Sequence, residues 1–138
     1  MEGGRAQDLG AGVAADGVGA GQAVAAQLAG GRRDGVERVA ACVVRADTRA
    51  DVNNLVKRRL DVRKASFAPM AEAVVMTGME YGGITPVGLP KDWPVLVDAR
   101  VAALPYVIVG SGVRNSKLAL PGAALAALPN AEVVQDLA

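Results

Sequence analysis

The clearest hydrophobic pattern begins at residue 36, where VERVAACVVR forms a nearly continuous run of apolar and β-branched positions. A short run of this kind is typical of a buried strand, so we expect a strand over residues 36–45. The apolar positions then shift to helical spacing, which predicts a helix over residues 47–60 with Thr48 or Asp51 as its N-cap. Its basic residues fall in the last turn, where the helix dipole favours them.

The second half of the chain alternates between short elements of both kinds. Pro69 is suited to the first position of a helix over MAEAVVMT, with Gly78 ending it, and Pro121 opens a second short helix over PGAALAAL. Strands are predicted at residues 61–68, 93–99, 106–112, 117–120 and 131–137. This order is not strictly βαβ, so the pattern predicts an α+β domain with a mixed sheet and flanking helices.

The first 35 residues differ from the rest, because they carry ten glycines and have weak periodicity. QAVAAQLA, ending at Gly30-Gly31, is predicted to be helical, and residues 1–20 are expected to be mobile. We therefore divide the chain into a partly disordered segment, 1–35, and one domain, 36–138.

Composition removes several kinds of chemistry. The formal net charge is +1 and the chain has no histidine, so it lacks the commonest general base and zinc ligand. Cys42 stands in an apolar run and is expected to be a buried, inert thiol. No cluster has metal-ligand spacing, so no metal or cofactor is predicted. The apolar runs are shorter than the ~18 residues of a membrane span, and no signal peptide is visible. We expect a cytoplasmic protein.

Residues 78–88, GMEYGGITPVG, hold four glycines and a proline. Consecutive amides at Gly82 and Gly83, beside the stiff Pro86, can bind an anion or stabilise an oxyanion. The same composition also suits a tight loop between a helix and a strand. The stretch is neither a Walker A loop nor a dinucleotide fingerprint, since the residues that define those motifs are missing.

Three further features have both a functional and an ordinary interpretation. GSGVRNSK, residues 110–117, is either a ligand-binding turn with Arg114 beside it or a hairpin connection. Asp98, at the end of a strand, is either a cap for the next turn or a ligand-orienting carboxylate. The basic run KRRLDVRK, residues 57–64, is either a phosphate contact or a solvated helix face.

Taken in order, TGMEYGGITPVGLP, VLVDA and VGSGVRNSKLAL resemble the YbaK/EbsC family of aminoacyl-tRNA editing domains, which are freestanding or attached to prolyl-tRNA synthetase. The resemblance covers roughly residues 36–138. It implies a mixed sheet with flanking helices and a pocket beside the glycine loop. It also implies hydrolysis of the ester of a mischarged tRNA without metal or covalent nucleophile, assisted by the 2′-hydroxyl of the terminal adenosine. The partners it implies are the acceptor end of the mischarged tRNA and an aminoacyl-tRNA synthetase, and no membrane partner is expected.

The resemblance can be carried over residue by residue. It implies catalytic roles for Gly82, Gly83, Thr85 and Pro86, and substrate-binding roles for Ile84, Gly88, Asp98, Gly110, Ser111, Gly112 and Arg114. The sequence departs from the family where a lysine is usual: if Gln22 corresponds to the family's glutamine, that position is Ala25. The chain is then either a divergent deacylase, a sequence with a wrongly read start, or a binding module of the same fold that has lost activity.

Overall fold

The computed structural model describes residues 21–138, and the expected mobility of residues 1–20 lies outside this range. The elements, in chain order, are β1 (Gln22–Arg33), β2 (Val36–Arg45), the π-helical turn η2 (Val52–Val56), α1 (Lys57–Leu60), β3 (Ala65–Phe67), α2 (Met70–Thr77), β4 (Val95–Asp98), α3 (Ala99–Ala102), β5 (Val107–Gly110), β6 (Lys117–Leu120), α4 (Gly122–Ala126) and β7 (Ala131–Val134).

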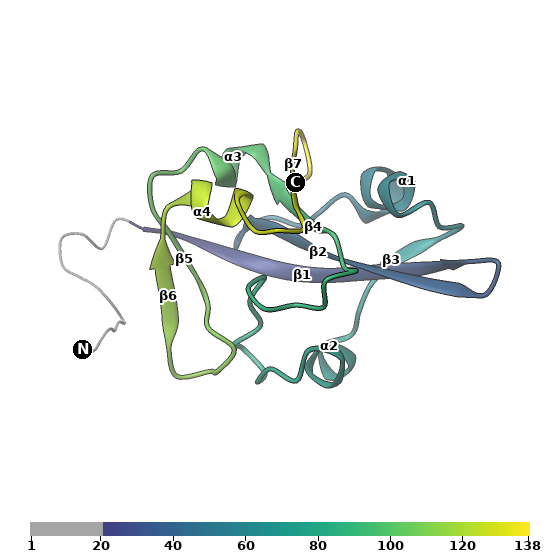
Figure 1. The fold of residues 1–138 in the computed structure, drawn as a ribbon, viewed down its shortest axis with the longest axis horizontal. Helices are drawn as coiled ribbons and strands as arrows, with labels where there is room; N and C mark the ends of the chain where they lie inside the picture. The colour runs from purple at the N-terminus through teal and green to yellow at the C-terminus, as the bar shows by residue number, and fades with distance from the viewer. Residues whose placement is uncertain (1–20) are drawn as a thin grey trace.

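The described strands form a single mixed sheet in the order β6-β5-β1-β2-β4-β7, with β3 added to β1 (Figure 1). The β1–β2, β1–β3 and β5–β6 pairs are antiparallel, whereas β1–β5, β2–β4 and β4–β7 are parallel. The predicted α+β class with a mixed sheet and flanking helices is therefore confirmed. Among residues 21–138, no helix has the length and apolar character needed to cross a bilayer.

The alternation of side chains along β2 and β4 builds two apolar cores, one on each face of the sheet. Ala41 and Val43 point to a core that is covered by α2, α3 and α4. Cys42 and Leu96 point to the other core, which is covered by η2 and α1. The residues that are apolar at consecutive positions of β2 are therefore buried on both faces, as the continuous run predicted.

The helix predicted at residues 22–29 is wrong, because these residues belong to β1, which pairs with β2 over ten positions. The glycines interpreted as a helix end sit inside the strand, where other backbone segments approach closely. A Cβ at Gly31 would overlap the carbonyl oxygen of Lys64, and a Cβ at Gly30 would lie 2.8 Å from the carbonyl oxygen of Arg38. The domain boundary expected at residue 36 falls in the turn of this β1–β2 hairpin. The domain therefore includes β1, which lies before that boundary.

Helical structure between β2 and β3 is shorter than the sequence predicts. It begins at Val52 and not at residue 47, and its first turn is π-helical. Asp51 is the N-cap, as expected, and its Oδ1 accepts a hydrogen bond of 3.2 Å from the amide of Asn54. The helix predicted over MAEAVVMT matches α2, with Pro69 as its N-cap and Gly78 closing it in the left-handed conformation.

Candidate functional site

The glycine loop, residues 78–88, connects α2 to β4 and packs against the turn between β5 and β6. Gly112 makes two backbone hydrogen bonds across this contact: its amide donates to the carbonyl of Gly83 at 2.7 Å, and its carbonyl accepts from the amide of Glu80 at 3.0 Å. β5 and β6 form an antiparallel hairpin in which Gly110 faces Lys117. The hairpin interpretation of residues 110–117 is therefore confirmed, and the two glycine-rich motifs meet in space.

Close approach of these two backbones explains two of the glycines. A Cβ at Gly83 would lie 2.6 Å from the carbonyl carbon of Val113, and one at Gly110 would lie 2.8 Å from the carbonyl oxygen of Gly83. Both distances are shorter than real Cβ contacts allow, so any side chain there would force the segments apart. Gly82 and Gly112 are required for a different reason, because their φ angles are +81° and +94°.

Of the paired glycines, Gly82 is the one with an accessible amide. The amide of Gly83 donates at 2.8 Å to the carbonyl of Glu80 and closes a turn. Gly82 is exposed, and among the described residues no acceptor is found for its N–H, whereas Thr85 and Pro86 are buried beneath the loop. Of the four predicted catalytic residues, Gly82 is thus the one that presents a backbone donor to the surface.

Charged side chains gather around Gly82. Its carbonyl accepts a hydrogen bond of 3.1 Å from Nζ of Lys117, and a Cβ built on it would lie 3.7 Å from Cγ of Arg114. The amide of Arg114 donates at 2.7 Å to Oε1 of Glu80. The sequence interpretation included Arg114 but missed Lys117 and Glu80. The register of the predicted hairpin, which sets Lys117 opposite Gly110, was the signal that could have identified Lys117.

Most of the other predicted residues of these two segments stabilise the loops, and Gly88 is the exception. The hydroxyl of Thr85 accepts a bond of 3.4 Å from the amide of Val87, and Ile84 is half-buried against the apolar core beneath the loop. Ser111 bonds to the carbonyls of Val113 and Ser116, which closes the β5–β6 turn. Gly88 is exposed with a φ of +83°, and a Cβ added to it would meet no atom within 4 Å.

Asp98 does not lie with these residues. Its Oδ1 accepts the amide of Arg100 at 2.8 Å, which caps α3, and its Oδ2 accepts the amide of Ala138 at 3.0 Å. Along β4 its side chain alternates to the face of Leu96, whereas Ile84 packs against the core on the other face. The geometry supports the capping interpretation and separates this carboxylate from the glycine loop.

The position aligned with the family's lysine also lies away from the loop. Ala25 alternates along β1 to the same face as Gln27, whose side chain bonds to the backbone of Thr48 and Ala50 on the η2 side. A long side chain at Ala25 would therefore extend away from the core beneath the glycine loop. The lysine that does reach the loop in this chain is Lys117.

No other described group offers obvious catalytic chemistry. Cys42 is fully buried, and this burial raises the pKa of its thiol to about 12. Within residues 21–138, no three Cys, Asp or Glu side chains are grouped closely enough to hold a metal ion. Three cavities lined by described residues lie around η2, α1, β7 and the start of β4, and none of those three includes a residue of the glycine loop. The pocket expected beside the loop stays a prediction.

The family of the chain follows from comparison with known proteins. The family model described as the aminoacyl-tRNA editing domain matches residues 31–128. This match covers well over half of the sequence, so the chain belongs to the aminoacyl-tRNA editing domain family. The resemblance carried by the glycine loop and the β5–β6 turn is thereby confirmed. A search of curated proteins found no match.

Solved structures share the fold. A candidate trans-editing enzyme for prolyl-tRNA synthetase is 25% identical, with a TM-score of 0.69, over 94% of this chain and 74% of that chain. The hypothetical protein APE2540 is 27% identical, with a TM-score of 0.71, over 84% and 73% of the two chains. A structure from computational grafting of epitopes onto scaffold proteins is 26% identical, with a TM-score of 0.68, over 88% and 78%.

Proposed function

We propose that this protein is an aminoacyl-tRNA deacylase that hydrolyses the ester of a mischarged tRNA in trans. Membership of the editing domain family and the similarity to a candidate trans-editing enzyme support this function. The observation that carries it furthest is local: the exposed amide of Gly82 stands beside two cationic side chains, Arg114 and Lys117. A backbone donor in a fixed loop is suited to stabilising a developing oxyanion.

The chemistry needs neither histidine nor metal in this proposal. An aminoacyl ester is already activated, so hydrolysis requires less barrier reduction than hydrolysis of a peptide. The Gly82 amide binds the oxyanion of the tetrahedral intermediate, and the 2′-hydroxyl of the terminal adenosine helps to activate the attacking water. Arg114 and Lys117 supply positive charge beside the ester, where the phosphates of the tRNA 3′ end also approach.

The remaining site residues support this constellation. Gly83, Thr85 and Pro86 fix the conformation of the glycine loop. Ile84 and Gly88 are the residues of the loop that contact the substrate. Gly110, Ser111 and Gly112 form the second wall. Because these walls are built from small residues, we expect the amino acid to be small. The proposed partners are the acceptor end of a mischarged tRNA and, in the cytoplasm, its synthetase.

The experiment compares two glycines that share a strained backbone. Gly82→Ala and Gly35→Ala each place a Cβ at a positive φ, +81° and +78°, with no atom closer than 3.7 Å. Both substitutions cost roughly 1–2 kcal/mol of backbone strain. Gly35 lies in the β1–β2 turn, so it controls for the loss of stability. Wild type and variants are assayed against tRNAs charged with Ala, Ser, Cys and Pro.

We expect wild type to release the amino acid from at least one of these tRNAs. Gly82→Ala should lower kcat/KM by at least about tenfold, since a displaced oxyanion donor costs up to ~10²–10³ in rate. Gly35→Ala should stay within about twofold of wild type. If wild type binds the charged tRNAs without releasing amino acid from any, the deacylase proposal is wrong and the alternative, a binding module of the same fold, replaces it.

A further inference from the structure

Positive charge is concentrated in one part of this nearly neutral chain. Residues 32–38 and 57–64 contain eight of the fifteen basic residues and three of the fourteen acidic ones, so the rest of the sequence is net negative. The two segments lie together, because the amide of Arg63 donates at 3.0 Å to the carbonyl of Arg32. The charge asymmetry of the sequence therefore becomes a single basic region in the fold.

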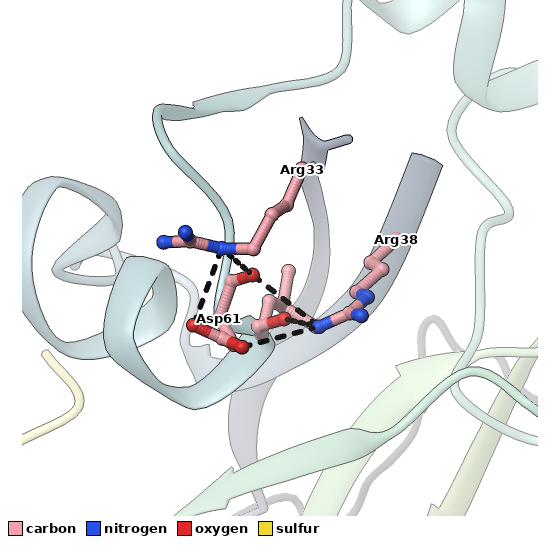
Figure 2. A network of polar contacts seen from close by, with 4 residues as sticks. Arg33, Arg38 and Asp61 are labelled. Carbon is pink, nitrogen blue, oxygen red and sulfur yellow. Dashed lines mark hydrogen bonds and ion pairs between the residues drawn. The ribbon is translucent and has the colours of Figure 1, made fainter. Parts of the chain in front are cut away.

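Two of these arginines have a structural role. Arg33 and Arg38 reach from the β1–β2 hairpin to the end of α1, as Figure 2 shows, and donate to the carbonyl of Asp61 at 2.9 and 3.3 Å. Both also pair with the Asp61 carboxylate, at 3.3 and 3.7 Å. The two arginines supply donors for the backbone carbonyl groups at the C-terminal end of α1, and they link the β1–β2 hairpin to this helix.

A third arginine of the region is also paired with a carboxylate. Arg59 pairs with Glu132 at 2.7 Å. The exposed cations that remain are Arg32, Lys57, Arg58, Arg63 and Lys64. In the part of the chain that the structure describes, no carboxylate lies within ion-pair distance of any of these five. We call them the α1 basic surface. Exposed cations without a carboxylate partner are available to contact an anionic ligand.

We infer that the α1 basic surface binds the phosphodiester backbone of the tRNA, an inference that rests on the proposed function. The glycine loop engages the aminoacylated 3′ end, while the rest of the tRNA must run past other parts of the protein. Figure 1 shows α1 and the hairpin tip at one end of the molecule and the β5–β6 hairpin at the other. Because the α1 basic surface lies at the opposite end of the molecule from the β5–β6 hairpin, a long polyanion fits both better than a small phosphorylated ligand does.

The chemistry of the α1 basic surface points to shape and charge readout. Long, exposed lysine and arginine side chains neutralise phosphates and carry no information on base identity. Each phosphate contact releases counterions. The logarithm of the binding constant therefore falls with the logarithm of the salt concentration, with a slope of about 0.7 to 0.9 per contact. The predicted binding is therefore strongly salt-dependent and similar for tRNAs of different sequence.

The test measures binding of fluorescently labelled, uncharged tRNA by anisotropy over a KCl series. The variants are Arg58→Ala, Lys64→Ala and the double variant, and Lys91→Ala is the matched control, because Lys91 is an exposed lysine outside this region. We expect the double variant to raise Kd about tenfold at low salt and to reduce the salt slope by about 1.5. Lys91→Ala should change Kd less than twofold.

The outcomes separate this inference from the proposed function. Hydrolysis of an aminoacyl ester of a short 3′-terminal oligonucleotide, which cannot span both sites, should be equal in wild type and double variant. A salt slope that the double variant leaves unchanged, or an equal effect of Lys91→Ala, would overturn the α1 basic surface as a tRNA site. Wild-type protein that binds tRNA through this surface but hydrolyses no ester would refute the deacylase proposal alone.

Discussion

Gly110→Ala tests whether close backbone contact holds the two halves of the candidate site together. The new Cβ would lie 2.8 Å from the carbonyl oxygen of Gly83 and 3.0 Å from its carbonyl carbon. These are backbone atoms that cannot rotate away, so the loop must move. Overpacking of this kind costs about 1–3 kcal/mol. Moving the loop also weakens the two hydrogen bonds at Gly112, each worth about 0.5–1.5 kcal/mol.

The expected loss of unfolding free energy is therefore about 2–4 kcal/mol. Urea denaturation, followed by circular dichroism and by the fluorescence of Trp93, measures it. Gly35→Ala is again the comparison, because its Cβ would meet no atom within 4 Å and the strain comes from φ alone. If Gly110→Ala destabilises the protein no more than Gly35→Ala does, the proposed contact between loop and turn is not rigid, and the explanation of these glycines is wrong.

Two further predictions concern buried polar groups. Asp98→Ala should lower the unfolding free energy by about 1–2 kcal/mol in urea denaturation, because α3 loses its cap and the amide of Ala138 its acceptor. If Asp98→Ala lowers the rate of deacylation without this destabilisation, the capping interpretation is wrong and Asp98 has the substrate-binding role. Burial raises the pKa of Cys42 to about 12, so the folded protein should resist iodoacetamide at pH 8 and react once denatured. Stability should also fall as pH rises above the ordinary thiol pKa of about 8.5, since the thiol then ionises in the unfolded chain alone; rapid alkylation of the native protein would contradict the burial.

Most elements after residue 36 could be predicted because their signals are local. Residues 39–44 are apolar and buried on both faces of the sheet, α2 has a proline before it and a glycine after it, and KLAL matches β6 over the same four residues. These patterns depend on burial and on backbone stereochemistry, which neighbouring residues express without help from distant parts of the chain.

The helix predicted at residues 22–29 failed because the deciding interactions are distant. An alanine-rich segment ending in two glycines has the local appearance of a helix and its terminator. In the fold it is a central strand that pairs with β2, β3 and β5, and Gly30 and Gly31 make room for neighbouring backbones. Tertiary pairing overrode local preference, as it does where a strand is bordered on both sides.

By itself, the sequence determined which residue types were available: glycines able to adopt positive φ at Gly82 and Gly112, a cationic run at 57–64, and no histidine anywhere. The tertiary structure alone decided which of them meet. It brought Lys117 to the carbonyl of Gly82 and sent Asp98 to the opposite face of the sheet. The reason is that backbone conformation is limited by each residue's own stereochemistry, whereas a shared site depends on strand register and on the alternation of side chains across a sheet.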